Sequence, residues 1–173
     1  MNRLQEFDVN LCIQFNRISA YRLAELFFRI ISRLGNGVFW FSLMLALPLV
    51  YGPPGWISTA QMMVAALPAL LIYRHLKKKT SRPRPCAVHP RVRQMTASLD
   101  QFSFPSGHTL HAVCFTFIAC SHFPGLSWLL VPFTLLVALS RPILGLHYPS
   151  DVLAGAAIGL GVATATGLLP FFR

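Results

Sequence analysis

The chain has 173 residues, of which 54% are hydrophobic and only 12% are charged. Water-soluble domains carry about a quarter charged residues, so this composition excludes an ordinary soluble protein and indicates that much of the surface meets lipid. The 15 basic and 5 acidic residues give a net charge of +10, but the cations cluster beside apolar runs, which argues against a nucleic-acid partner. The length fits one domain covering residues 1–173.

The first 34 residues mix apolar side chains with Arg, Asp, Glu and Asn. Met1–Arg17 lacks a continuous apolar core, so no cleavable signal peptide is expected. The pattern favours amphipathic helices lying at the membrane interface over a sixth, tilted span. We therefore expect an interfacial segment at 1–34, followed by a transmembrane catalytic core at 35–173.

Five apolar runs come close to the roughly 20 residues that a helix needs to cross a bilayer. They are Gly35–Tyr51, Trp56–Leu76, Pro105–Phe123, Leu126–Leu144 and Pro149–Phe172. The predicted fold is an all-α, integral-membrane helical bundle of about five transmembrane helices. This number of spans brings the N-terminus, the basic loop Lys77–Phe104 and the junction Arg141–Asp151 to one face of the membrane.

Two motifs lie at the ends of spans on that shared face. The stretch Lys77–Pro85 is strongly cationic, and taken alone it is typical of a positive flank that anchors a helix at anionic headgroups. Pro105-Ser106-Gly107-His108 begins a span, where Ser106 can cap the helix and Gly107 lets an anion approach backbone N–H groups. The alternative for this second motif is an ordinary capped helix start with an interfacial histidine.

A third motif joins the last two spans, with Arg141 at the end of one and Asp151 at the start of the next. His147 and Asp151 are four residues apart, so the carboxylate can bond one ring nitrogen and leave the other as a nucleophile. The alternative is a helix-capping aspartate beside an interfacial histidine.

Together, the three motifs resemble the signature of the type 2 phosphatidic acid phosphatases, a family that shares its fold with bacterial class A acid phosphatases and vanadium haloperoxidases. The family pattern is Lys-x6-Arg-Pro, then Pro-Ser-Gly-His, then Ser-Arg-x5-His-x3-Asp. The matching positions, in order and with full spacing, are Lys77, Arg84-Pro85, Pro105–His108, Ser140-Arg141, His147 and Asp151.

The resemblance implies a phosphohistidine mechanism in which His147 attacks phosphorus, Asp151 orients its ring and His108 serves as acid and then base. It assigns the phosphate oxygens to cations, a hydroxyl and a backbone N–H group. These phosphate-binding residues are Lys77, Arg84, Ser106, Gly107 and Arg141. No metal or cofactor is expected, because the cations replace a divalent ion.

Several residues match no motif position. We interpret five of these cations as attracting lipid headgroups: Lys78, Lys79, Arg82, Arg91 and Arg93. His111 lies one turn after His108 and is a candidate to support it. The four cysteines show no metal or redox spacing and are interpreted as packing residues, although a Cys12–Cys86 bridge would form if both faced an oxidising compartment.

The resemblance implies a lipid phosphate as substrate and no obligate protein partner. The small five-span build with short loops resembles bacterial undecaprenyl diphosphate and phosphatidylglycerophosphate phosphatases. We favour undecaprenyl diphosphate, and phosphatidylglycerophosphate, phosphatidic acid and lipid A phosphates are the alternatives, since the three motifs do not separate them. A vanadium haloperoxidase is disfavoured because those proteins are soluble and larger, and a non-catalytic protein that binds anionic lipid would not need His108 or the His147–Asp151 pair. Lys/Arg counting puts the basic face in the cytoplasm, whereas the family places its site outward. We favour a bacterial inner-membrane protein whose site faces the periplasm or exterior.

Overall fold

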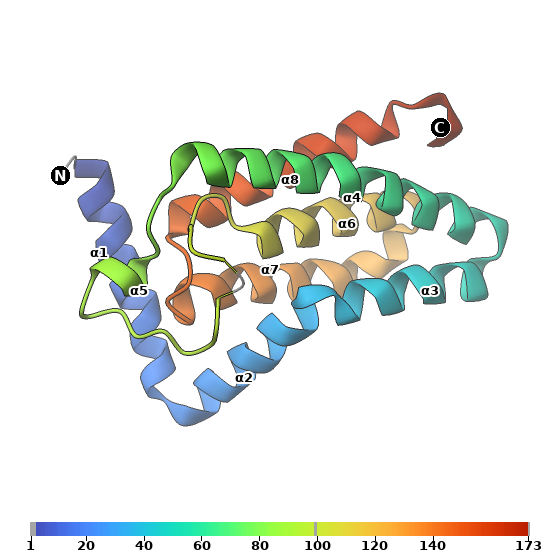
Figure 1. The fold of residues 1–173 in the computed structure, drawn as a ribbon. Helices are drawn as coiled ribbons and strands as arrows, with labels where there is room; N and C mark the ends of the chain where they lie inside the picture. The colour runs from blue at the N-terminus through green and yellow to red at the C-terminus, as the bar shows by residue number, and fades with distance from the viewer. Residues whose placement is uncertain (1–2, 99, 173) are drawn as a thin grey trace.

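The computed structural model describes residues 3–98 and 100–172. Within these ranges the chain forms eight α-helices and no β-strand beyond a single antiparallel bridge between Pro83 and Phe102. The helices, drawn in Figure 1, are α1 (Arg3–Arg17), α2 (Arg22–Arg33), α3 (Phe39–Tyr51), α4 (Pro53–Thr80), α5 (Pro85–Val88), α6 (Gly107–His122), α7 (Ser127–Ile143) and α8 (Pro149–Gly167).

Four helical segments of the described chain are long and apolar enough to cross a membrane. They are Arg22–Tyr51, Pro53–Thr80, Pro124–Ile143 and Pro149–Gly167. The fifth expected span corresponds to α6, which has 16 residues and is about 24 Å long, somewhat less than the bilayer core of about 30 Å. Helices α4, α7 and α8 pack around α6. The all-α integral-membrane bundle is confirmed.

The segment Arg22–Tyr51 is long and apolar enough to span a membrane, but it consists of two helices. A kink at Leu34–Val38 separates α2 from α3, and Gly37 adopts a φ of +120°, a conformation that favours glycine. Helix α2 is amphipathic, as the sequence indicates. The boundary between an interfacial segment and the transmembrane core at residue 34 stays a prediction.

Helix α1 lies across one end of the bundle (Figure 1) and packs against α7 and α8. Asp8, Cys12 and Asn16 follow one another every four residues, so they share its buried face. The Asn16 side-chain amide donates hydrogen bonds to the carbonyl oxygens of Ile143, at 2.9 Å, and Arg93, at 3.0 Å. Through these bonds α1 holds the end of α7 and the loop at Arg93.

Helices α6 and α8 pack closely because two glycines of α8 face α6. A Cβ atom at Gly155 would lie 2.5 Å from the Ser106 carbonyl oxygen, and one at Gly159 would lie 2.3 Å from that of Leu110. The approach also joins the first residues of the two helices, since the Ser106 N–H donates to the Asp151 carbonyl oxygen at 3.0 Å. Two of the sequence motifs therefore meet at the same end of the bundle.

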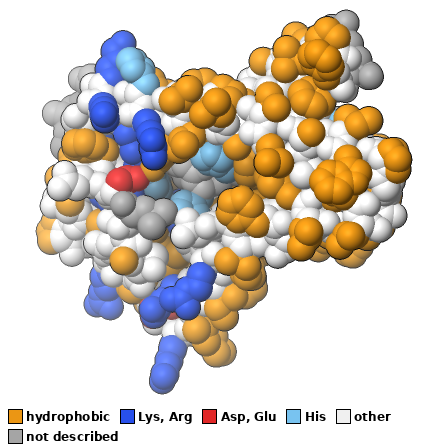
Figure 2. All heavy atoms as spheres, turned by 45° about the vertical axis from the view of Figure 1, so that its right-hand side comes forward, with side chains coloured by type: hydrophobic (Ala, Val, Ile, Leu, Met, Phe, Trp, Pro, Cys, Tyr) orange, Lys and Arg blue, Asp and Glu red, His pale blue; other side chains and the backbone are white. Residues whose placement is uncertain are grey.

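Polar segments gather at that end, as predicted from the number of spans. Helix α1, the loop around α5 and the turn between α7 and α8 lie together, while the C-terminus lies at the opposite end (Figure 1). Figure 2 shows Lys and Arg side chains on one part of the surface and hydrophobic side chains over the rest. A hollow with histidine side chains inside it lies between the two regions.

Candidate active site

The turn between α7 and α8 positions His147. Tyr148 caps α8, and the Asp151 carboxylate accepts a hydrogen bond from the Tyr148 N–H at 2.9 Å, which fixes the carboxylate under the turn. Asp151 Oδ2 lies 3.7 Å from His147 Nδ1. The other ring nitrogen, Nε2, lies 3.4 Å from Arg84 Nη1. The 3.7 Å contact is longer than a hydrogen bond and Nδ1 has no hydrogen-bond partner among the residues that the structure describes, so the expected bond from Asp151 to the ring is not formed in this structure. Nε2 faces the guanidinium of Arg84.

The surroundings of His147 favour its neutral form. The side chain is buried, and burial lowers its pKa well below the ordinary value, with the charges of Arg141, Arg84 and Lys77 lowering it further. A neutral imidazole keeps a lone pair on one nitrogen. His147 therefore has the protonation state that a nucleophile requires.

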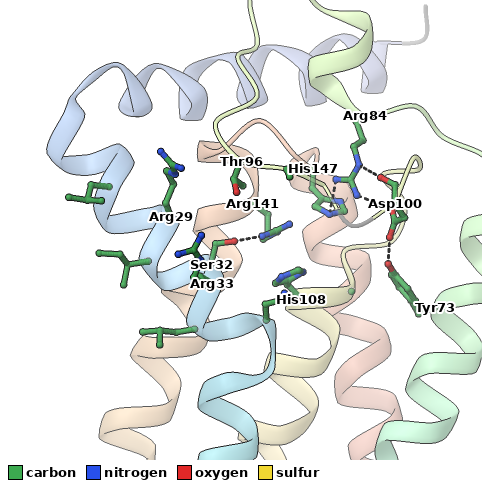
Figure 3. A pocket seen from close by; sticks show the side chains of 16 residues that line it. Arg29, Ser32, Arg33, Tyr73, Arg84, Thr96, Asp100, His108, Arg141 and His147 are labelled. Carbon is green, nitrogen blue, oxygen red and sulfur yellow. Dashed lines mark hydrogen bonds and ion pairs between the residues drawn. The ribbon is translucent and has the colours of Figure 1, made fainter.

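A cavity of about 360 Å³ opens in front of His147. Figure 3 shows that its walls come from segments far apart in the sequence, including α2, the loop before α6 and the ends of α6 and α7. Five of the sequence-predicted site residues line it: Arg84, Gly107, His108, Arg141 and His147. The volume lies near the lower end of the range for small-molecule sites, roughly 300–1,000 Å³.

Arg141 is a buried cation without a counter-ion in the last turn of α7. Its Nη1 donates to the Ser32 hydroxyl at 2.6 Å, while its Nε has no hydrogen-bond partner. Among the described residues no carboxylate lies within ion-pair distance of it. A buried charge is costly unless it is paired, so an anion bound beside Arg141 would stabilise it.

Asp100 organises two other cations of the site. Its carboxylate accepts hydrogen bonds from Lys77, from the Tyr73 hydroxyl and, at 2.9 Å, from Arg84 Nη2. Burial acts to raise the pKa of Asp100, but the hydrogen bonds from Lys77 and Tyr73 outweigh it and the pKa is lowered. The ionised carboxylate therefore fixes Arg84, whose Nη1 also donates to the Leu146 carbonyl oxygen at 2.7 Å.

Helix α6 begins at the floor of the cavity. Gly107 packs against the Tyr73 ring, where a Cβ atom would lie 2.6 Å from a ring carbon, so a larger residue would displace Tyr73. The Ser106 hydroxyl is fully buried and shares a hydrogen bond with the Thr109 hydroxyl at 3.0 Å. His108, the second residue of the helix, lines the same cavity as His147 (Figure 3).

The three remaining sequence-predicted residues lie outside the cavity lining. Lys77 lies behind Asp100, Ser106 behind Gly107 and Asp151 behind His147. The phosphate-binding roles of Lys77 and Ser106 remain predictions. So does independence of a metal ion; the residues that the structure describes contain no group of three His, Cys, Asp or Glu side chains that could hold one.

Arg82 was expected to attract headgroups, and this interpretation is wrong. Its guanidinium donates to Asp151 Oδ1 at 2.7 Å and to Asp8 Oδ2 at 2.6 Å, and it lies 4.0 Å from the centre of the Tyr148 ring. Asp8 also accepts the Ser150 N–H at 3.0 Å. Arg82 therefore ties α1 to the carboxylate behind His147. The other cations of that group are exposed: Lys78, Lys79, Arg91 and Arg93.

A second, apolar cavity of about 500 Å³ adjoins the first between α3, α4 and α6. Four residues line both cavities: Asn36, Tyr73, Gly107 and His108. Phe41 and Met63, also in its lining, are exposed on the apolar surface, so this groove opens toward the lipid. His111 faces the groove, and its Nδ1 lies 2.9 Å from the Gly107 carbonyl oxygen, where it supports the start of α6.

The four cysteines are free thiols, so the Cys12–Cys86 bridge does not form. Cys12 is buried under the catalytic turn, and its Sγ lies 3.8 Å from the His147 carbonyl oxygen. Burial raises the pKa of this thiol to about 12, which keeps it protonated and unreactive. Packing explains its presence.

The chain shares sequence with curated phosphatases. Undecaprenyl-diphosphatase BcrC of Bacillus subtilis is 38% identical over 91 residues, which cover 53% of this chain and 44% of that protein. Decaprenylphosphoryl-5-phosphoribose phosphatase of Mycobacterium tuberculosis is 36% identical over 108 residues, covering 61% of this chain and 55% of that protein. The chain thus spans about half the length of the curated relatives it matches.

A similar fold occurs in a crystal structure of a transmembrane PAP2-type phosphatidylglycerolphosphate phosphatase from Bacillus subtilis. The TM-score is 0.77 at 24% identity, with 96% of this chain and 85% of that chain covered. The sequence profile of the PAP2 superfamily matches residues 58–173, which include the three motifs. The chain belongs to the PAP2 superfamily.

Proposed function

We propose that this protein removes a terminal phosphate from a membrane lipid by way of a phosphohistidine at His147. The observation that carries the proposal is the neutral His147 ring, which lies in the lining of a cavity that also holds Arg141, a buried cation with no carboxylate within ion-pair distance in the described part of the chain. A phosphate group supplies the missing negative charge. Arg84 and Arg141 then lie beside the phosphorus that His147 attacks.

In the first step the His147 Nε2 lone pair forms the N–P bond while the bond from phosphorus to the leaving oxygen breaks. His108 gives its proton to that oxygen, and Asp151 stabilises the resulting positive charge on the His147 ring. In the second step His108 takes a proton from water, whose oxygen attacks phosphorus and releases His147 and inorganic phosphate. Arg84, Arg141 and the start of α6 stabilise the charge on the phosphoryl oxygens in both steps.

The apolar groove supports a lipid as the substrate. It meets the polar cavity at His108, so a chain can remain among the membrane-facing side chains while its phosphate reaches His147. Because the groove opens between α3 and α4, the lipid enters sideways from the bilayer. Chain anchoring raises the local concentration of the phosphate without a dedicated soluble-ligand pocket.

The substrate that we favour is a polyprenyl diphosphate such as undecaprenyl diphosphate. The similarity to an undecaprenyl-diphosphatase supports this choice. The decaprenyl relative is also named for a polyprenyl lipid, and both named substrates carry a second phosphoryl group between the chain and the phosphate that is removed. Phosphatidylglycerophosphate, phosphatidic acid and lipid A phosphates are the competing substrates.

We further propose that the site faces the periplasm or exterior. Lys77, Arg82, Arg84 and Arg141 are engaged inside the site, so they are not free cations that would hold this end of the bundle in the cytoplasm. A cysteine placed at Lys79 should react with a membrane-impermeant thiol reagent in intact spheroplasts. Reaction only after the membrane is opened would mean that the site faces the cytoplasm.

The test of the reaction is phosphate release from a panel of purified lipid phosphates by wild type and His147→Ala. Loss of the nucleophile should reduce turnover by about 10³-fold or more while the protein remains folded. The wild type should remain active in excess EDTA, since Arg84 and Arg141 supply the positive charge that a metal ion would otherwise provide. Residual turnover above about a tenth of wild type in His147→Ala would mean that His147 is not the nucleophile. Loss of activity in EDTA that Mg²⁺ or Zn²⁺ restores would mean that the reaction needs a metal ion.

A further inference from the structure

One face of α2 contributes polar side chains to the catalytic cavity, although no family motif lies in this helix. Arg29, Ser32, Arg33 and Asn36 all line the cavity, and their spacing of three and four residues places them on one side of the helix and its following turn. Figure 3 shows Arg29, Ser32 and Arg33 along the wall opposite Arg84 and Asp100. Ser32 already has a role, because it binds Arg141.

The two arginines of this face make the mouth of the cavity positive. Arg29 pairs with Glu25 at 3.2 Å, and about half of its side chain remains exposed. Arg33 has no carboxylate within ion-pair distance among the residues that the structure describes. The acidic residue of the lining is Asp100, which is already bound to Lys77 and Arg84. Arg33 and Arg29 therefore remain available for an anionic ligand.

The polar face of α2 lies where the catalytic cavity and the apolar groove meet. Asn36, at the end of the α2 face, lines both the polar cavity and the apolar groove, as does His108. A lipid with its chain in the groove and its terminal phosphate at His147 must pass this junction. The chemical group next to the terminal phosphate then lies beside α2.

We infer that Arg33, assisted by Arg29, binds a second phosphoryl group of the substrate, the one between the terminal phosphate and the lipid chain. This inference rests on the proposed function. The recognised chemistry is a phosphoryl group with at least one negative charge, either the inner phosphate of a diphosphate or the phosphodiester of a glycerolipid. Guanidinium groups suit both, because they donate paired hydrogen bonds to phosphate oxygens. Arg33 is thus a specificity residue that separates two-phosphate lipids from simple phosphomonoesters.

The experiment compares substrates that share a chain and differ in the second phosphoryl group. Farnesyl diphosphate is paired with farnesyl monophosphate, and phosphatidylglycerophosphate with phosphatidic acid. Full-length wild type, Arg33→Gln, Arg29→Gln and the double variant are assayed in one detergent. Arg33→Gln should lower kcat/KM for the two-phosphate member about tenfold more than for its one-phosphate partner, mainly through KM, and the double variant more still.

Two matched variants control for charge and folding. Arg22→Gln removes a cation from the exposed part of the same helix outside the cavity lining, and it should leave the ratio of the two kcat/KM values unchanged. Arg33→Lys keeps the charge and should recover part of the ratio. Thermal unfolding of each variant verifies that it is folded.

The outcomes separate the explanations. A selective loss on the farnesyl pair identifies the inner phosphate of a diphosphate as the ligand, and one on the glycerolipid pair identifies a phosphodiester. Two outcomes would overturn the inference: equal losses of kcat/KM on both members of each pair, or the same change in the ratio of kcat/KM values in Arg22→Gln. Either would mean that Arg33 only attracts lipid headgroups in general. Inactivity of the wild type on all four lipids would instead remove the proposed function itself.

Discussion

At the scale of single residues, the site depends on carboxylates that hold its cations and its histidine. Asp100 fixes Lys77 and Arg84, and Asp151 lies behind His147. Each carboxylate is held in turn, Asp100 by the Tyr73 hydroxyl and Asp151 by Arg82. Because the supporting groups are themselves partly or fully buried, the reacting groups are oriented before the substrate arrives.

Arg82 provides the first prediction at this scale. Arg82→Gln should lower kcat about tenfold or more, because the buried Asp151 loses its cationic partner and holds the His147 ring less firmly. Lys79→Gln, an exposed cation in the same basic stretch, is the control and should retain activity. Steady-state kinetics on one lipid phosphate give kcat for both variants. Similar kcat values would mean that Arg82 only attracts headgroups.

The sequence predicts the residues that we propose to react, but not those that support them. His108, His147, Arg84 and Arg141 follow from motif spacing, and the cavity brings all four together. The contact between Arg82 and Asp8 joins positions 74 residues apart, and no local pattern announces it. Asp100 is a charged residue in a largely uncharged stretch, and that was the signal for its role in the sequence. Its partners on α4 follow only from the folded structure, in which the loop before α6 lies against α4.

At the scale of elements, apolar runs predict the helices well because a span must be apolar over most of its length. The expected run at Leu126–Leu144 agrees with α7 within one residue at each end. Helix α2 is amphipathic, which is typical of an interfacial helix, and the kink after it lies close to the expected boundary at residue 34. The turn at Leu34–Val38 changes the direction of the chain and lets α2 border the cavity while α3 borders the groove.

The contact between α6 and α8 leads to a prediction about stability. Gly159→Ala should destabilise the protein by about 1–3 kcal/mol, because the new Cβ would meet the Leu110 carbonyl oxygen and force the helices apart. Gly161→Ala on the same helix, where no atom lies within 4 Å of the new Cβ, should be neutral or stabilising by up to about 1 kcal/mol. Thermal unfolding in one detergent compares the pair. Equal unfolding temperatures would mean that α6 and α8 do not pack this closely.

At the scale of the whole molecule, the polar cavity and the apolar groove form one continuous space at the boundary between charged and hydrophobic surface (Figure 2). Composition and the position of the motifs predict that phosphate chemistry takes place near headgroup depth. They do not predict the groove, since its lining combines residues from three helices and depends on how those helices pack.

The groove yields a prediction that separates the lipid chain from the phosphate. Ala66→Trp should fill the groove and lower kcat/KM for a long-chain lipid phosphate about tenfold or more, with a much smaller effect on p-nitrophenyl phosphate. Ala60→Trp, at an exposed position of α4 outside the groove, is the matched control. Wild type should itself prefer the lipid. Equal losses on both substrates in Ala66→Trp would mean that the groove does not hold the chain.

Because the groove opens toward the lipid, the proposed function would let the protein encounter its substrate in two dimensions. The relevant quantity would then be the mole fraction of phosphorylated lipid among its neighbours, and not the amount per volume of solution. Adding inert lipid at constant total substrate should therefore slow turnover, and crowding the same molecules into a smaller membrane area should speed it up. On this proposal the rate of phosphate release would report the composition of one leaflet of the membrane.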